Sequence, residues 1–77
     1  EIKLLKIDAE GSELEVLEGS KKIFNNIDYI SVDCGAEKGV NQDTTFVDVN
    51  NYLISNNFSL IGINQNRLIC LYRNNRV

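Results

Sequence analysis

The chain has 77 residues and a formal net charge of −3, with 8 Lys and Arg against 11 Asp and Glu. The basic residues form no run that could follow a phosphate backbone, and no apolar stretch approaches the ~20 residues of a transmembrane helix. Nucleic acid and membranes are therefore not expected partners. A hydrophobic content of 43% predicts one small, packed domain.

The two cysteines, Cys34 and Cys70, lie far apart in the sequence, and the chain contains no His. These residues match no zinc-binding spacing and no Cys–His nucleophile. Each Cys lies in an apolar, strand-like pattern, where a free thiol behaves as a small hydrophobic side chain. We therefore expect free, buried thiols in a reducing, cytoplasmic setting.

The first predicted strand covers residues 2–7. Apolar side chains occur on both of its faces, a pattern typical of a parallel sheet that helices cover on both sides. Residues 8–11 end the strand. Ser12, followed three positions later by Glu15, has the form of a capping box, which predicts that a helix begins there.

Apolar residues then recur at helical spacing as far as Phe24, although Gly19 is expected to weaken or interrupt this helix. Residues 27–34 predict a strand, and residues 35–43 predict a loop. An apolar stripe predicts a second helix over residues 44–57. Two final apolar stretches, residues 58–63 and 67–73, are joined by three polar residues and predict an antiparallel hairpin.

The predicted order is therefore β-α-β-α-β-β, which is typical of the α/β class. Two consecutive βα units imply a parallel core with right-handed crossovers, and the terminal hairpin adds one antiparallel strand to the sheet.

Ligand sites in open α/β sheets lie beyond the carboxyl ends of the strands, where this chain carries Asp8, Glu10 and Asp33. Asp8 directly follows the first strand, before a Gly-containing turn, and is the leading candidate, with Glu10 second. Two acids alone do not predict a metal site. Glu13, beside them, is explained by the favourable interaction of acids with a helix N-terminus.

Residues 4–19 read LLKIDAEGSELEVLEG. This segment resembles, without a gap, the segment LLKIDVEGAELEVLKGA of FkbM-type methyltransferases. Residues 27–33 are similar to the next strand of that family, which typically ends on an acid, often Glu where this chain has Asp33. Ala9 stands where the family usually has Val.

The resemblance implies the C-terminal half of a class I methyltransferase (Rossmann-like) sheet, so that residues 1–77 form a single partial domain. In that fold, the loops that hold S-adenosylmethionine precede the segments present here. The resemblance therefore implies that this chain alone is inactive, whereas the parent enzyme methylates a hydroxyl on a sugar or natural product. Asp8 and Glu10 are the expected catalytic residues, with Asp8 at the reacting centre and Glu10 supporting it.

A rival hypothesis is a non-catalytic α/β module that binds a partner through its sheet edge or its acidic strand ends. In the methyltransferase sheet that the resemblance implies, residues 2–7 lie in the middle, beside the first strand of the missing half. In the isolated chain they are therefore expected to form an open edge strand, guarded only by Lys3 and Lys6. Such an edge favours pairing with another chain, so we expect a homodimer through this strand.

Overall fold

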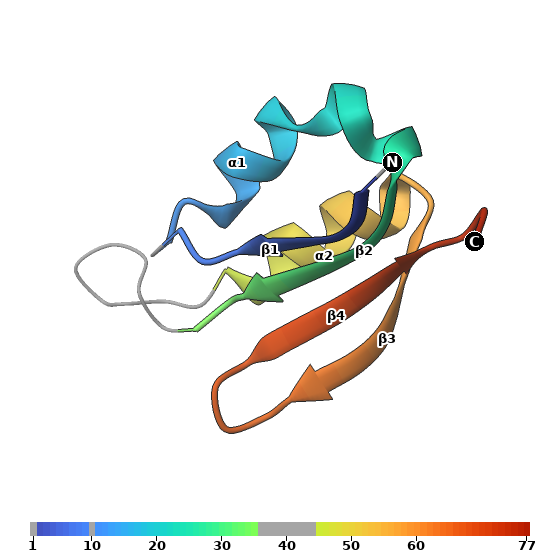
Figure 1. Cartoon of the computed structure of the whole chain (residues 1–77). Helices are drawn as coiled ribbons and strands as arrows, with labels where there is room; N and C mark the ends of the chain where they lie inside the picture. Colours follow the sequence, from blue (N-terminus) through green and yellow to red (C-terminus); the bar gives the residue numbers. More distant parts are fainter. Residues whose placement is uncertain (1, 10, 36–44) are drawn as a thin grey trace.

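The computed structural model describes residues 2–9, 11–35 and 45–77 (Figure 1). The predicted mixed α/β architecture is confirmed. The elements, in chain order, are β1 (Ile2–Ile7), α1 (Glu13–Gly19), the 3-10 helix η1 (Lys21–Asn26), β2 (Ile27–Asp33), α2 (Phe46–Ser55), β3 (Phe58–Asn64) and β4 (Ile69–Asn74).

The four described strands form one sheet in the order β1-β2-β4-β3. β1 and β2 are parallel, whereas β4 runs antiparallel to both of its neighbours, β2 and β3. The last strand of the chain is thus inserted into the interior of the sheet. β1 and β3 form its two edges.

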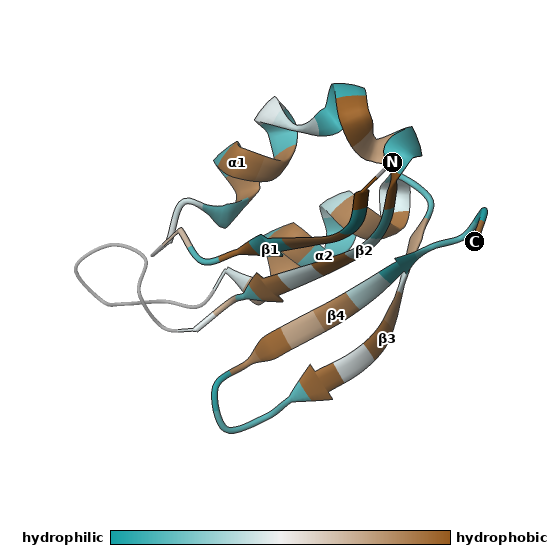
Figure 2. Ribbon diagram, viewed as in Figure 1, coloured by the Kyte–Doolittle hydropathy of each residue, from teal (hydrophilic) through white to brown (hydrophobic). Residues whose placement is uncertain are grey.

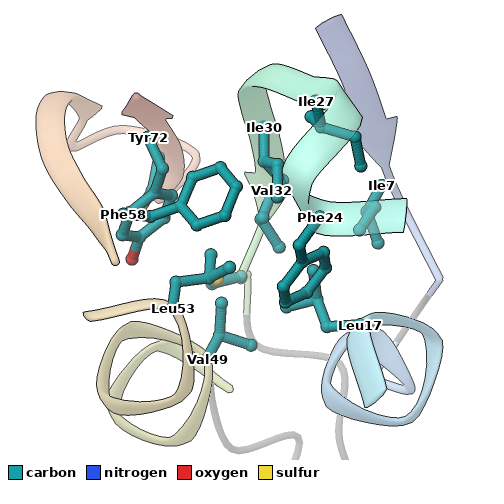
Figure 3. Close-up of a cluster of buried hydrophobic side chains, with 12 residues drawn as sticks. Ile7, Leu17, Phe24, Ile27, Ile30, Val32, Val49, Leu53, Phe58 and Tyr72 are labelled. Carbon is teal, nitrogen blue, oxygen red and sulfur yellow. The ribbon is translucent and has the colours of Figure 1, made fainter. Parts of the chain in front are cut away.

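The strand register sorts the side chains into two faces. Leu5, Ile30 and Tyr72 lie in one cross-strand row, and Ile7, Val32 and Cys70 lie in the next. This face is covered by both helices, and Figure 3 shows side chains of the strands and of the helices pointing toward one another. The fully or almost fully buried hydrophobic residues are Ile7, Leu17, Phe24, Ile27, Ile30, Val32, Cys34, Val49, Leu53, Phe58, Cys70 and Tyr72.

Helix placement on the sheet follows from the apolar stripes. Leu17 of α1 and Val49 and Leu53 of α2 are completely buried against the sheet. The ring of Phe24 in η1 packs edge-on against that of Phe58, with 5.5 Å between centroids. Hydrophobic residues concentrate in the strands, whereas the β3–β4 turn is hydrophilic (Figure 2).

The opposite face of the sheet has no helical cover among the described residues. Leu4, Tyr29 and Arg73 form one of its cross-strand rows, and Leu4 is 48% exposed. The apolar pattern of residues 2–7 predicted helices on both faces. The part of the chain that the structure describes supplies them for one face only.

Local details differ from the predictions at two turns. Ser12 precedes α1, but its side chain makes no capping hydrogen bond, so the predicted capping box is wrong. In the β3–β4 turn, the left-handed residue is Leu68, with φ 54°, rather than one of the polar residues of the predicted connection. Gly19 does end α1, as its low helix propensity predicted.

The end of β4 is fastened to the start of β2. The buried Asn74 side chain donates from Nδ2 to the carbonyl oxygens of Phe24 and Ile27, each at 3.0 Å. These bonds satisfy carbonyl groups at the end of η1. None of the described helices is long and apolar enough to cross a membrane.

Candidate functional site

The carboxyl ends of β1 and β2 meet the beginning of β4 at one end of the sheet. Because β4 is antiparallel to β2, its first residue, Ile69, pairs with the last residue of β2, Asp33. A pocket of about 250 Å³ opens there, which we call the strand-end pocket. It is lined by Lys6, Ile7, Asp8, Ser31, Asp33, Arg67 and Ile69.

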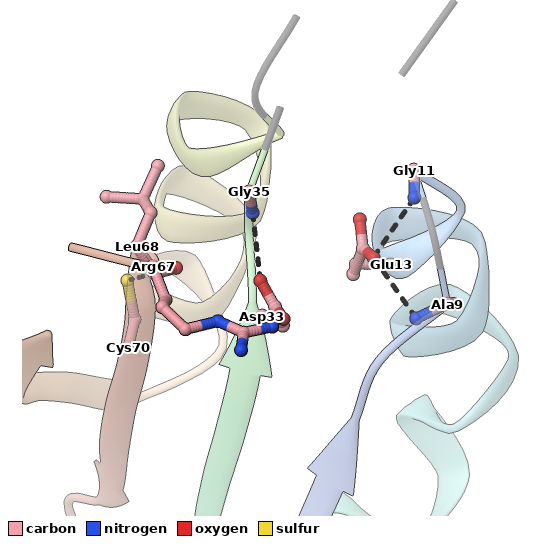
Figure 4. Close-up of polar contacts among 8 residues, drawn as sticks. All are labelled: Ala9, Gly11, Glu13, Asp33, Gly35, Arg67, Leu68 and Cys70. Atoms are coloured by element: carbon pink, nitrogen blue, oxygen red, sulfur yellow. Dashed lines mark hydrogen bonds and ion pairs between the residues drawn. The ribbon is translucent and has the colours of Figure 1, made fainter. Parts of the chain in front are cut away.

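Asp33 is held in place by two contacts at the rim of this pocket (Figure 4). Its Oδ1 accepts a hydrogen bond from the backbone N–H of Gly35 at 3.1 Å, and its Oδ2 lies 3.7 Å from Nη2 of Arg67. Both carboxylate oxygens of Asp33 therefore already have partners within the chain.

Asp8 is in a different situation. It follows β1 directly, its side chain is exposed, and the described residues supply no ion-pair partner for it. Its carboxylate is thus available to a ligand in the strand-end pocket.

Glu13 organises the turn that carries Asp8, although it does not line the pocket. It is the first residue of α1 and is only 2% exposed. Its Oε2 accepts hydrogen bonds from the N–H groups of Ala9 and Gly11, each at 3.1 Å (Figure 4). Gly11 has φ 99°, a left-handed conformation that a side chain would strain.

The second oxygen of Glu13 reaches across the fold. Oε1 accepts a hydrogen bond of 2.9 Å from Oγ1 of Thr45, the residue before α2. Glu13 is an acid in the first turn of α1, as predicted, but it also makes contacts that the sequence did not indicate. Its buried carboxylate ties the turn after β1 to the beginning of α2, which fixes the backbone on which Asp8 stands.

The two predicted catalytic residues have different outcomes. Asp8 lines the strand-end pocket, at the end of its strand. Glu10 lies outside the described residues, so the predicted pairing with Asp8 stays a prediction. The described residues contain no cluster of three side chains suited to hold a metal ion.

The family model for the methyltransferase FkbM domain matches residues 1–60. The chain belongs to the FkbM methyltransferase family. No curated protein and no solved structure matches the chain significantly. The resemblance of residues 4–19 to this family is thereby confirmed. The match includes most of the residues that line the strand-end pocket of this FkbM domain, namely Lys6, Ile7, Asp8, Ser31 and Asp33.

Sequence reasoning missed three polar residues of this FkbM pocket: Lys6, Ser31 and Arg67. Lys6 and Ser31 face each other across β1 and β2, on the face without helices. Their alternation with Ile7 and Val32 was a usable signal, because a polar residue between two buried ones lies on the opposite face. Arg67 lies near them only because β4, which follows it in the chain, pairs antiparallel with β2.

The thiols of the FkbM domain are buried and free, as predicted. Burial raises the pKa of the Cys34 thiol from 9.0 to about 12, against a smaller opposing effect of its hydrogen bond with Thr45. Burial also raises the pKa of Cys70. A thiol must ionise to act as a nucleophile, so neither cysteine is suited to that role near neutral pH.

A second cavity of the FkbM domain, of about 320 Å³, lies at the opposite end of the sheet and is the larger of the two. It is lined by Phe24, Asn25, Asn56, Asn57, Asn74, Asn75 and Arg76. It contains no acid or nucleophile, and the amide of Asn74 is already used by backbone carbonyls. The strand-end pocket therefore remains the better candidate for chemistry.

Proposed function

We propose that the chain is part of an S-adenosylmethionine-dependent methyltransferase whose parent enzyme methylates a hydroxyl group of a sugar or natural product. The observation that carries this proposal is the position of Asp8. In a chain that belongs to the FkbM family, an exposed carboxylate lines a pocket at the carboxyl end of a strand, where α/β sheets bind ligands.

The sheet supports the proposal that another part of the enzyme supplies the rest of the domain and most of the cofactor site. The order β1-β2-β4-β3, with an inserted antiparallel strand, suits the last four strands of a class I methyltransferase sheet. One face lacks helices among the described residues, and the pocket of about 250 Å³ is below the usual 300–1,000 Å³ of small-molecule sites. We therefore propose that residues 1–77 are the second half of the domain and that most of the cofactor site lies outside them.

The residues of the strand-end pocket suit transfer to a hydroxyl. The cofactor supplies a methyl group on a sulfonium, which the hydroxyl oxygen attacks while the thioether departs. In our proposal, Asp8 aligns that hydroxyl and accepts its proton. Asp33 is already engaged by the Gly35 N–H and by Arg67. In the same proposal, Glu10, two positions after Asp8 in the sequence, supports Asp8.

The test is methyl transfer by the parent enzyme from isotopically labelled S-adenosylmethionine to a panel of sugars and hydroxylated natural products. Asp8→Asn keeps the size of the side chain and removes its charge, so turnover should fall at least ~100-fold while the thermal midpoint changes little. Asp48→Asn is the control, because Asp48 is an exposed acid on α2. Equal turnover in both variants would remove Asp8 from the reaction.

An interaction module without catalysis is the second candidate function. Among the described residues β1 is an edge strand and Leu4 is 48% exposed, which favours this candidate because another chain can pair with such a surface. The two candidates separate in the same assay, because an interaction module transfers no methyl group to any acceptor.

A further inference from the structure

The hydroxyl of Thr45 is used in an unexpected way. Thr45 directly precedes α2, where a Thr side chain ordinarily accepts a hydrogen bond from an N–H group of the first helical turn. Its side chain makes no such capping bond to the described residues of α2. Oγ1 donates instead to Oε1 of Glu13, which is 32 positions away in the sequence. Thr45 is only 3% exposed, so capping of its own helix does not explain this buried hydroxyl.

The same hydroxyl also forms a hydrogen bond with the thiol of Cys34, which follows Asp33 at the end of β2. A hydroxyl has one proton, and that of Thr45 is donated to Glu13, so the thiol is the donor in this second bond. Burial keeps the thiol protonated near neutral pH, because it raises the pKa of Cys34 from 9.0 to about 12. Thr45 therefore joins the end of β2 to Glu13.

The second oxygen of Glu13 acts on the backbone of Asp8 itself. It accepts the N–H of Ala9 at 3.1 Å, and this N–H belongs to the peptide group that joins Asp8 to Ala9 (Figure 4). The turn that follows is closed by a bond of 3.0 Å from the Ser12 N–H to the Ala9 carbonyl oxygen. Because the peptide group is planar, Glu13 fixes the direction in which the chain leaves Asp8.

We propose that Thr45, acting through Glu13, is a positioning residue for Asp8 in methyl transfer. This inference rests on the proposed function, in which Asp8 aligns the acceptor hydroxyl and accepts its proton. Thr45 does not line the strand-end pocket; its hydroxyl orients the Glu13 carboxylate, which in turn holds the Asp8 backbone. Since the same hydroxyl contacts Cys34, next to Asp33, one side chain links the two strand ends that line the pocket.

Backbone positioning matters for Asp8 because the described residues hold its side chain by no ion pair. A group that accepts a proton must lie within roughly 2.6–3.2 Å of the donor oxygen, so a shift of about 1 Å in the turn is enough to remove it from reach. The hydrogen bonds of Glu13 are the restraint that the described structure provides against such a shift. Thr45 is the side chain that holds Glu13 from the other side.

A double-mutant cycle in the parent enzyme separates positioning from stability. With labelled S-adenosylmethionine and the best acceptor of the sugar and natural-product panel, Thr45→Val should lower kcat by about 10- to 100-fold with little change in KM. In an Asp8→Asn background the same substitution should change kcat less than about 2-fold, because the position of Asp8 no longer matters there. Thr45→Ser keeps the hydroxyl and should restore most of the turnover. Ser55→Ala is the matched control, because it removes an exposed hydroxyl that bonds within α2.

Amide hydrogen exchange of the parent enzyme, without cofactor or acceptor, gives a readout that does not depend on activity. Thr45→Val should speed exchange at Ala9 and Gly11 by at least ~5-fold, because Glu13 is then held from one side only. Thr45→Ser should leave this exchange near that of the wild-type enzyme. If Thr45→Val does not fold, Glu13→Gln takes its place in the cycle, since it keeps the shape of the side chain and weakens the acceptor.

The outcomes separate the positioning role from the proposed function. Equal falls of kcat in the wild-type and Asp8→Asn backgrounds would show that Thr45 acts on stability alone, and would overturn the positioning role while leaving that of Asp8 in place. Unchanged exchange at Ala9 in Thr45→Val would have the same meaning. Unchanged turnover in Asp8→Asn by itself would instead overturn the catalytic role of Asp8, and the positioning role with it.

Discussion

Replacing Glu13 by Ala removes the side chain that accepts hydrogen bonds from Ala9, Gly11 and Thr45. The Gly11 and Thr45 bonds are buried, so the substitution leaves a buried N–H and a buried hydroxyl without their acceptor. Each orphaned group costs about 1–3 kcal/mol, so the two together give a loss of about 2–6 kcal/mol in the free energy of unfolding. A 77-residue domain has only about 4–12 kcal/mol in total.

Thermal and urea denaturation, followed by circular dichroism, measure this loss. A destabilisation of about 3 kcal/mol should lower the thermal midpoint by roughly 12–24 °C. Glu15→Ala is the matched control, because Glu15 is an exposed acid in the same first turn, and it should cost less than about 1 kcal/mol. All variants are compared at one protein concentration, since dimerisation would make the midpoint concentration-dependent.

Amide hydrogen exchange adds a local readout for the same variant. The amides of Ala9 and Gly11 should lose protection in Glu13→Gln more than those of the β4 strand do, because the neutral amide is a weaker acceptor. Equal stability of the Glu13 and Glu15 variants, together with unchanged exchange at Ala9 and Gly11, would refute the role assigned to the buried carboxylate.

Calorimetric titration of the 77-residue chain with S-adenosylmethionine should show no binding in the micromolar range, and a dissociation constant near 1 µM, about −8 kcal/mol, would contradict the proposed division of the cofactor site. The raised pKa of Cys34, from 9.0 to about 12, means that the unfolded chain releases this proton first as the pH rises. The contribution of the Cys34 thiol to the free energy of unfolding is therefore complete below pH 9 and should be lost between pH 9 and 12. In urea titrations over this range, Cys34→Ala should lose less stability than the wild-type chain, and equal losses would exclude the thiol as the cause. Gly11→Ala should destabilise the chain by at least ~1 kcal/mol, because φ is 99° there, whereas Gly19→Ala should stabilise it by up to ~1 kcal/mol, since a Cβ meets nothing within 4 Å. If the thermal midpoint of Gly11→Ala were higher than that of Gly19→Ala, backbone strain at Gly11 would not be important.

The predictions from sequence succeeded where a single segment carries the signal. The strand before Asp8, the interruption at Gly19 and the second helix around Val49 each follow from local spacing. The position of Asp8 at the carboxyl end of a strand followed from a general rule about parallel sheets, and in the structure Asp8 lines the strand-end pocket. Its role in ligand binding stays a prediction.

The failures come from partners that are distant in sequence. Ser12 and Glu15 matched a local capping pattern, yet the carboxylate that organises the turn is Glu13, whose partner Thr45 lies 32 positions away. Arg67 reaches Asp33 only because β4 enters the sheet beside β2. Neither pairing leaves a periodic signal in the sequence, since each depends on the finished topology.

The long-range contacts of Asn74 and of its strand, β4, also bear on the order in which the sheet can form. Its bonds to Phe24 and Ile27 span 50 and 47 positions, and the strand that carries it fills the space between β2 and β3. Contacts of such long range close large loops and form late, so β2 remains unpaired on one side until the C-terminal segment arrives. During synthesis, residues 69–74 must have left the ribosome before this sheet can form, and until then one edge of β2 and the β4-facing edge of β3 stay unpaired and open to aggregation.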